Sequence, residues 1–124
     1  MKIHESAENY LETILMLSKK QPYVRSIDIA NELNFSKPSV SVAMKNLRSS
    51  GHILVDDAGH ITLTESGLTV AESIFERHKV LSNMLILLGV DPEIASEDAC
   101  RIEHVISKES FEAIKAHIEQ NTPH

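Results

Sequence analysis

Hydrophobic residues return every three or four positions through the first half of the chain, as they do in helices that bury one face. In the first such segment Ala7, Leu11, Ile14 and Leu15 fall on one stripe. The same period continues in two shorter segments, the second of which is followed by a glycine, a residue type typical of helix C-termini. The pattern predicts three helices, at residues 5–20, 26–33 and 36–50.

A different pattern follows the third predicted helix. Two short extended runs, at residues 52–55 and 60–63, are separated by Asp-Asp-Ala-Gly, a composition that favours a tight turn. These runs predict a β-hairpin. Beyond the hairpin the helical period returns, with Gly89 as a helix-ending residue and Pro92 at the start of the next helix. We expect three further helices, at residues 65–88, 92–107 and 108–120.

This order of elements sets the expected fold class. The protein is predicted to be mostly α-helical, with a winged helix-turn-helix of three helices and a two-stranded wing, followed by a second, α-helical domain. We place the boundary after Ser66, which gives domains at residues 1–66 and 67–124.

The composition indicates a globular protein, with 42% hydrophobic and 24% charged residues. No apolar run approaches the about 20 residues that span a bilayer, and the acidic N-terminal segment is unlike a signal peptide. The single cysteine, Cys100, cannot form an internal disulfide, which agrees with a reducing compartment. We therefore expect a soluble, cytoplasmic protein with no membrane partner.

The charge of the chain is unevenly distributed. The formal net charge is −6, which by itself argues against a nucleic-acid partner. However, residues 33–55 contain Lys37, Lys45 and Arg48 and no acidic residue, whereas residues 67–124 contain ten acidic and five basic residues. The basic segment coincides with the third predicted helix, where a DNA-reading element would need it.

That helix has the features of a reader helix. Small hydroxyl side chains near its start allow close approach to a groove about 12 Å wide, and its N-terminus favours a phosphate. The alternative is that Ser36 only caps the helix and that its basic residues are solvated charges. The order of elements favours DNA binding, although Asp56 and Asp57 at the wing tip indicate that the wing contributes little. The candidate DNA contacts are Ser36, Lys37, Pro38, Ser39, Ser41, Lys45 and Arg48.

A second constellation lies near the C-terminus. Cys100, Glu103 and His104 have the spacing i, i+3 and i+4, which would put three ligand-type side chains on one helical face. The opposite face would then supply core contacts through Ala95, Ala99, Ile102, Val105 and Ile106. Thiolate, carboxylate and imidazole together suit a divalent transition ion. The competing interpretation is a small buried cysteine beside a solvated Glu-His pair.

Three ligands on one helix are too few, so other elements must contribute. His78 in the long helix is one candidate, and Glu12 and Asn9 on the first helix are two more. An enzyme would need an open coordination position and a separate general base, and no such base is apparent.

Several stretches resemble the diphtheria toxin repressor family of iron- and manganese-dependent transcriptional regulators. They are ENYLETI (8–14), SKPSVSVAMKNLRSSGHI (36–53), ITLTESG (61–67), RHKVL (77–81) and EDACRIEHVIS (97–107). The resemblance implies a homodimer that binds palindromic double-stranded DNA operators when Fe(II) or Mn(II) is bound. Co(II), Ni(II) or Zn(II) would substitute in vitro. It also implies that the second domain binds the metal and dimerises, and that the chain is a short form without the SH3-like domain of longer members.

The resemblance also assigns metal ligands. His78 matches a position shared by both branches of the family, and Cys100, Glu103 and His104 match the iron-type site. Glu12 matches the manganese branch, whereas Asn9 stands where iron regulators tend to have methionine and manganese regulators aspartate.

The ancillary site of the iron branch is changed in this chain. Ser82 and Ser96 replace a glutamate and a histidine there, so a second metal would need other ligands, with Glu97 and Glu8 as weak candidates.

The sequence therefore predicts a metal-dependent repressor that controls metal homeostasis genes, is more iron- than manganese-responsive, and acts on no small-molecule substrate. The alternatives are a winged-helix regulator with a vestigial metal site, controlled by another ligand or partner, and a metalloenzyme.

Overall fold

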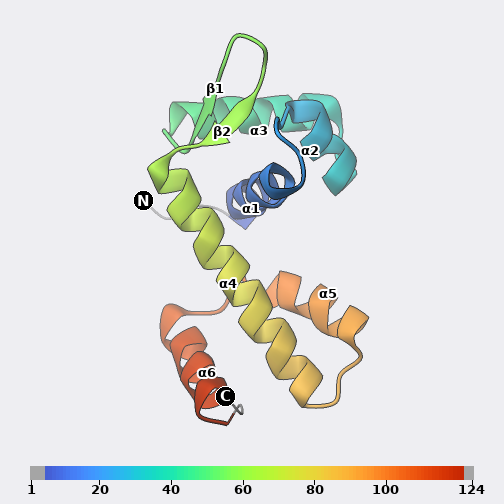
Figure 1. Ribbon diagram of the computed structural model, residues 1–124, viewed down its shortest axis with the longest axis vertical. Helices are drawn as coiled ribbons and strands as arrows, with labels where there is room; N and C mark the ends of the chain where they lie inside the picture. The colour runs from blue at the N-terminus through green and yellow to red at the C-terminus, as the bar shows by residue number, and fades with distance from the viewer. Residues whose placement is uncertain (1–4, 122–124) are drawn as a thin grey trace. The chain divides into compact units, whose positions relative to one another are not determined.

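The computed structural model describes residues 5–121, and this part of the chain forms six helices and one antiparallel hairpin (Figure 1). In chain order the elements are α1 (Glu5–Lys20), α2 (Ser26–Leu33), α3 (Lys37–Ser49), β1 (Ile53–Val55), β2 (Ile61–Leu63), α4 (Glu65–Leu87), α5 (Pro92–Ile102) and α6 (Lys108–Asn121). The predicted fold class is confirmed.

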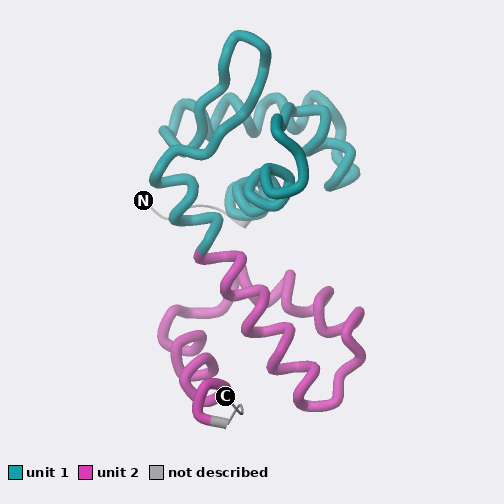
Figure 2. The backbone as a smooth tube through the Cα atoms, viewed as in Figure 1, with its two compact units in different colours: residues 1–72 teal, residues 73–124 magenta. Residues whose placement is uncertain are grey.

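The chain divides into two compact units inside α4 (Figure 2). Unit 1 comprises Met1–Glu72 and unit 2 comprises Ser73–His124. The boundary predicted from the sequence lies slightly earlier, after Ser66, because hydrophobic periodicity cannot show that the first turns of α4 belong to the N-terminal unit.

The core of unit 1 is built from one face of each of its helices. α1 packs against α2, α3 and β2, and α3 also packs against β1. The predicted stripe of α1 is buried at Leu11, Ile14 and Leu15. Burial of each such side chain favours folding by about 1.5–3 kcal/mol. α2 ends at Leu33, and its C-cap Asn34 adopts the left-handed conformation (φ 57°) and turns the chain towards α3.

The wing is a short hairpin whose two faces differ. β1 and β2 pair antiparallel, with Ile53 opposite Leu63 and Val55 opposite Ile61. Ile53 and Ile61 are buried. The Ile61 N–H donates to the Val24 carbonyl at 2.7 Å, which fixes the loop between α1 and α2 against the wing.

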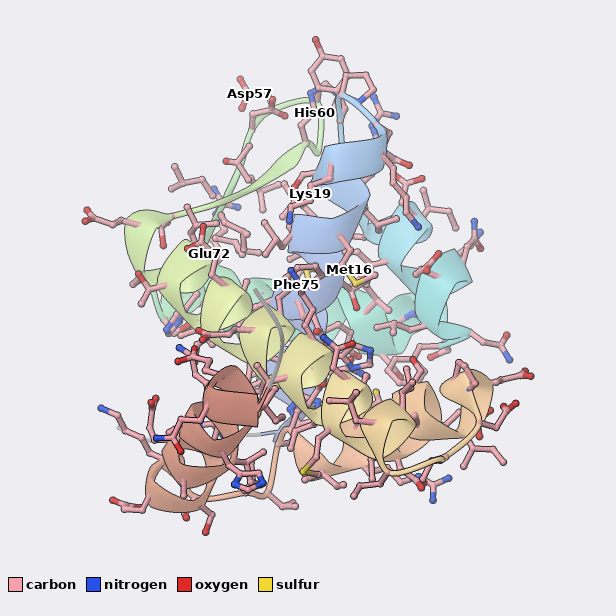
Figure 3. All side chains as sticks on the ribbon, turned by 60° about the horizontal axis from the view of Figure 1, so that its bottom comes forward. Met16, Lys19, Asp57, His60, Glu72 and Phe75 are labelled. Atoms are coloured by element: carbon pink, nitrogen blue, oxygen red, sulfur yellow. The ribbon has the colours of Figure 1, made fainter. Side chains whose placement is uncertain are left out.

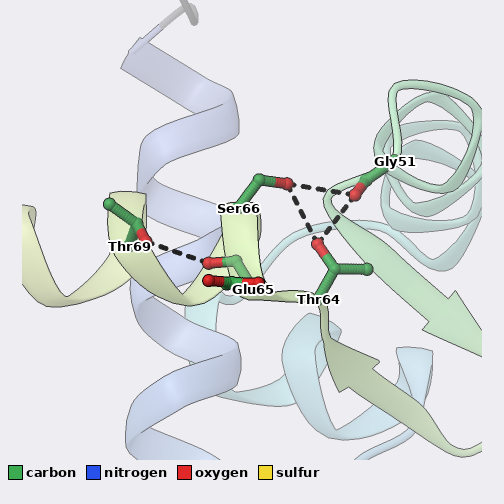
Figure 4. A pocket seen from close by; sticks show the side chains of 5 residues that line it. All are labelled: Gly51, Thr64, Glu65, Ser66 and Thr69. Carbon is green, nitrogen blue, oxygen red and sulfur yellow. Dashed lines mark hydrogen bonds between the residues drawn. The ribbon is translucent and has the colours of Figure 1, made fainter.

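The start of α4 is bound closely to the end of the reader-helix segment. The hydroxyls of Thr64 and Ser66 both donate to the Gly51 carbonyl, at 2.7 and 3.2 Å (Figure 4). The Thr64 N–H donates to the His52 carbonyl at 3.1 Å. Gly67 lies so close to that carbonyl that a Cβ atom on it would be 2.0 Å from the His52 oxygen. A glycine is therefore required at this position.

The helices of unit 2 are joined by side chains of α4. Leu81, Ala95, Ala99 and Phe111 are buried in this unit. The guanidinium of Arg77 lies 5.5 Å from the centre of the Phe111 ring, and an ion pair joins Lys115 on α6 to Glu76 on α4. Lys79 on the same helix lies 5.6 Å from the centre of the Phe75 ring.

The predicted helix at 92–107 is shorter than expected. α5 ends at Ile102, and residues 103–105 form a turn. The Arg77 guanidinium donates to the carbonyls of Glu103 and Ile106, at 3.2 and 3.1 Å. Both carbonyls belong to the segment that follows α5, so a side chain of α4 holds the chain where it leaves the helix. The prediction that Val105 is a core residue is wrong as well, since it is 74% exposed.

Within the described residues no helix has the length and hydropathy needed to cross a membrane.

Candidate DNA-binding helix and metal centre

The reader helix α3 has one buried and one open face. Val40, Met44 and Leu47 are buried against the rest of unit 1. All seven predicted DNA contacts are exposed: Ser36, Lys37, Pro38, Ser39, Ser41, Lys45 and Arg48. The helical spacing of the apolar residues is what separates the two faces, so the sequence was sufficient to predict which side chains are available to a ligand.

The N-terminus of α3 is fixed by its own serines. Ser36 is the N-cap, and its hydroxyl oxygen accepts the Ser39 N–H at 3.3 Å while donating to the Ser39 hydroxyl oxygen at 2.8 Å. The predicted capping role of Ser36 is confirmed. Pro38 occupies the first turn, where its missing N–H leaves no intrahelical bond unmade.

One further residue on the open face of α3 was not among the predicted DNA contacts. Val42 is 60% exposed, although it is apolar and belongs to an amphipathic helix. The exposure of Val42 could have been predicted from the helical period, because Val42 lies between Val40 and Met44 and therefore outside the buried stripe of the helix. An exposed valine on a reader helix can contact the methyl group of a thymine.

The wing tip is less repulsive to phosphate than its two aspartates suggest. The Asp56 carboxylate accepts the N–H groups of Ala58 and His60, at 2.9 and 2.8 Å, and pairs with the His60 ring at 3.2 Å. Arg25 reaches the other ring nitrogen of His60, at 3.3 Å, and Tyr23 stacks on the ring. Figure 3 shows Asp57 and His60 at the turn of the wing. The negative charge of Asp56 is thus engaged by hydrogen bonds and by the His60 ring within the turn.

We expect replacement of Asp56 by Ala to loosen the wing turn. The His60 N–H bond, which is the largest cause, lowers the pKa of Asp56 below its ordinary value of 3.8. A lowered folded-state pKa means that the carboxylate stabilises the turn above pH 3.8 and that this contribution is lost as the pH falls through the lowered value. Hydrogen exchange of the Ala58 and His60 amides at neutral pH should be faster in Asp56→Ala, whereas Asp57→Ala should leave it unchanged. Equal exchange in all three proteins would contradict this role.

A buried carboxylate forms the centre of the second candidate site. The Glu103 side chain is 0% exposed, and its Oε2 lies 2.8 Å from His78 Nδ1. Its Oε1 lies 3.4 Å from His104 Nε2, and the His104 side chain is 3% exposed. An ionised carboxylate in such a position is costly unless cationic or hydrogen-bonding groups compensate it. One carboxylate between two imidazoles is a donor set that fits a divalent transition ion.

His78 and Glu103 are 25 positions apart in the chain and are brought together by tertiary structure. His78 lies in α4, and Glu103 is the C-cap of α5. Arg77, beside His78, binds the Glu103 carbonyl and thereby holds the end of α5 against α4. Glu103 shares the buried face of α5 with Ala99, four positions earlier.

Cys100 lies elsewhere on α5. It is exposed, and within the described residues it belongs to no cluster of three or more ligand-type side chains. The expectation that Ala99 faces away from the ligands is wrong, because Ala99 and Glu103 are both 0% exposed. The i, i+3 spacing leaves Cys100 and Glu103 on neighbouring parts of the helix surface, and of the two only Glu103 is buried.

The remaining candidates are spread over both units. On α1, Glu12 is 7% exposed and Glu8 and Asn9 are partly buried. No hydrogen bond or ion pair joins the Glu12 carboxylate to another described residue. In unit 2, Glu97 is exposed, Ser96 contacts the His78 ring, and the buried Ser82 hydroxyl has no hydrogen-bond partner among the described residues.

The fold and the two sites define a class of protein: a winged-helix protein with a helical metal-binding unit. Two family models match the chain, the N-terminal DNA-binding domain of iron dependent repressors over residues 2–61 and their metal-binding and dimerisation domain over residues 64–124. The chain belongs to the diphtheria toxin repressor family of metal-dependent transcriptional regulators. This membership favours a transcriptional regulator over the metalloenzyme alternative.

Relatives and solved structures agree with this assignment. The chain is 36% identical over 117 residues to the transcriptional regulator MntR of Salmonella typhimurium, which covers 94% of this chain and 74% of MntR. It is 34% identical to an HTH-type transcriptional regulator of Methanocaldococcus jannaschii, with 94% of both chains covered. The manganese regulator SloR superposes with a TM-score of 0.81 at 26% identity, over 96% of this chain and 55% of SloR. A manganese-dependent transcriptional repressor in complex with manganese gives a TM-score of 0.83 at 27% identity, over 91% of this chain and 52% of the repressor.

Proposed function

We propose that this protein is a metal-dependent transcriptional repressor that binds a palindromic operator as a homodimer when Fe(II) or Mn(II) is bound, and that it acts in the cytoplasm on metal homeostasis genes. The observation that carries the proposal is the buried Glu103 carboxylate between two imidazoles, in a chain that also presents an open reader helix.

We place the metal at the Glu103 carboxylate, with His78 and His104 as its neighbouring ligands. A bound divalent ion supplies two positive charges that compensate the buried carboxylate. The family resemblance adds Glu12 from α1, and the burial of that carboxylate without a described ion pair supports the addition. Asn9, Glu8 and Glu97 stay weaker candidates. Metal binding would bias the conformations of the chain towards a DNA-competent one, by no more than the differential affinity of the ion for that conformation.

The choice between the two metals depends on Cys100. The predicted iron preference rested on a thiolate ligand, whereas the buried carboxylate of Glu103 lies between two imidazoles and Cys100 is exposed. Oxygen and nitrogen ligands suit Mn(II), and the names of the solved relatives include a manganese regulator and a manganese-dependent repressor. We therefore propose Mn(II) as the activating ion, with Fe(II) as the alternative should Cys100 prove to be a ligand. Co(II), Ni(II) or Zn(II) would substitute in vitro.

The dimer is proposed from unit 2. Its matching family model describes a dimerisation domain, and the end of α4 exposes a contiguous apolar segment. Ile86, Leu87 and Leu88 are 41%, 69% and 74% exposed. A two-fold dimer through this surface would present two reader helices to half-sites one DNA turn apart, about 34 Å.

Mobility of a palindromic promoter fragment tests the proposed function directly. The fragment should be retained after addition of Mn(II) or Fe(II) under anaerobic conditions and released by a chelator. Retention that is independent of metal would favour the alternative, a winged-helix regulator with a vestigial site, for which Asn9, Ser82 and Ser96 are the supporting departures from the family pattern.

We expect Lys45→Ala and Arg48→Ala to weaken binding to every DNA sequence, because both side chains are exposed on the open face of α3 and would neutralise phosphates. The slope of log affinity against log salt should fall by about one unit for each lost phosphate contact. Ser39→Ala should instead change sequence preference. Lys108→Ala, an exposed lysine in unit 2, is the control; an equal loss from it would mean that the effect is one of net charge.

A further inference from the structure

The two ring nitrogens of His78 have different partners within unit 2. Nδ1 lies 2.8 Å from Glu103 Oε2, and Nε2 lies 3.3 Å from the hydroxyl oxygen of Ser96. The His78 side chain is 28% exposed. Its orientation therefore depends on these polar contacts as well as on packing.

A histidine that binds a metal through one nitrogen commonly forms a hydrogen bond through the other, and that outer partner fixes the ring orientation and the proton position. When Nδ1 is the ligand atom, the outer partner must accept the Nε2–H group. A serine hydroxyl can accept this hydrogen bond, and it can donate one when Nε2 carries no proton. Ser96 lies 18 positions from His78 in the chain, so its approach results from the packing of α5 on α4.

On this basis we propose that Ser96 is a positioning residue for the metal site: its hydroxyl holds the His78 ring with Nδ1 directed towards Glu103, so that Nδ1 is the ligand atom. The inference rests on the proposed function. It gives Ser96 a role of its own at a position where the iron branch of the family has a ligand. It also reserves His78 for a single metal, because a neutral hydroxyl is a poor ligand for these ions.

Metal affinity is the first readout. We expect Ser96→Ala to bind Mn(II) about 10- to 100-fold more weakly than wild type, measured from the electron paramagnetic resonance signal of free Mn(II), as is typical when an outer partner of a ligand is removed. Ser96→Thr retains a hydroxyl and should restore most of the affinity. Ser110→Ala makes the same chemical change at another exposed serine of unit 2 and should bind as wild type does.

A second readout does not require metal. The 15N chemical shifts of the His78 ring in the metal-free chain report the hydrogen bonding of each nitrogen. Ser96→Ala should shift Nε2, whereas Ser96→Thr and Ser110→Ala should not. The thermal midpoints of all four metal-free proteins should be similar because Ser96 is exposed, so a general loss of structure would be recognised.

The outcomes separate the two proposals. If the wild-type chain binds no Mn(II), Fe(II) or Co(II), the proposed function fails, and the positioning role fails with it. If the wild type binds Mn(II) and Ser96→Ala binds it equally well with an unchanged Nε2 shift, the positioning role alone is overturned. Weaker binding that threonine does not restore would also overturn it, since the hydroxyl would then not be the active group.

Discussion

Glu103→Gln should abolish the metal response while leaving the metal-free protein folded. The glutamine has the same shape and can still accept a hydrogen bond from His78, but it removes the buried charge that a divalent ion would compensate. A metal that binds only the folded state stabilises it by about 2.7 kcal/mol at a free concentration 100 times its Kd. We expect this gain in the wild type and almost none in the variant, with a loss of affinity beyond the about 10- to 100-fold typical of an outer partner.

Thermal unfolding with chelator and with Mn(II), followed by operator retention under the same conditions, measures both effects. Glu93→Gln is the matched control, because it makes the same change at an exposed position of α5. A Glu103→Gln protein that responds to Mn(II) as the wild type does would place the metal elsewhere.

A companion variant, Cys100→Ala, tests the ion preference in the same assays. If the thiol stays outside the site, the response to Fe(II) and Mn(II) should be unchanged, and the thiol should be alkylated equally fast with and without metal. A loss of the Fe(II) response, or protection of the thiol by metal, would instead support the iron-type site predicted from the sequence.

The second large effect is expected from Gly67→Ala. A helical glycine replaced by alanine ordinarily stabilises a protein by about 0.4–1 kcal/mol, because the unfolded chain loses freedom. Here the new Cβ would lie 2.0 Å from the His52 carbonyl oxygen, a backbone atom that also accepts the Thr64 N–H. Relief requires a shift of the helix or of the segment before the wing. We expect a loss of about 1–3 kcal/mol or more, as for other overpacked sites.

For a chain of this size that loss should lower Tm by roughly 4 to 12 °C. Gly51→Ala is the comparison: Gly51 has a positive φ of 81° but nothing within 4 Å of a new Cβ, so only backbone strain opposes the change. Gly67→Ala should be the more destabilising of the two. A rise in Tm for Gly67→Ala would show that the close approach to His52 is absent in solution.

The positions of the helices were predictable because their signals are local. The periodicity of apolar residues, the capping serine at Ser36 and the glycine at Gly51 depend on neighbours within one or two turns, and the structure reproduces α3 within a residue at each end. The open face of α3 followed from the same periodicity. The end of α5 was not predicted: the helix stops at Ile102, and the segment after it is held by hydrogen bonds from Arg77 on α4, a residue distant in the sequence.

The candidate metal site was predicted in its residue types and only partly in its arrangement. His78 and Glu103 were both candidates, and the structure brings their side chains into contact. The grouping of Cys100 with Glu103 rested on their i, i+3 spacing, which places them on neighbouring parts of one helix surface. Which part of that surface is buried depends on how α5 is rotated about its axis and on what it packs against, and the structure buries Glu103 and exposes Cys100.

The sequence by itself determined the order and type of the elements, the basic open face of α3 and the residue types available for a metal, because these depend on local period, capping and composition. Only the tertiary structure decided that Asp56 is engaged inside the wing turn, that Gly67 must lack a side chain, and that Ser96 contacts His78. The physical reason is that such contacts join residues of different elements, or depend on the detailed path of a turn. A shift of a few ångströms or a partial rotation of one helix changes them, while the pattern of hydrophobic and polar positions stays the same.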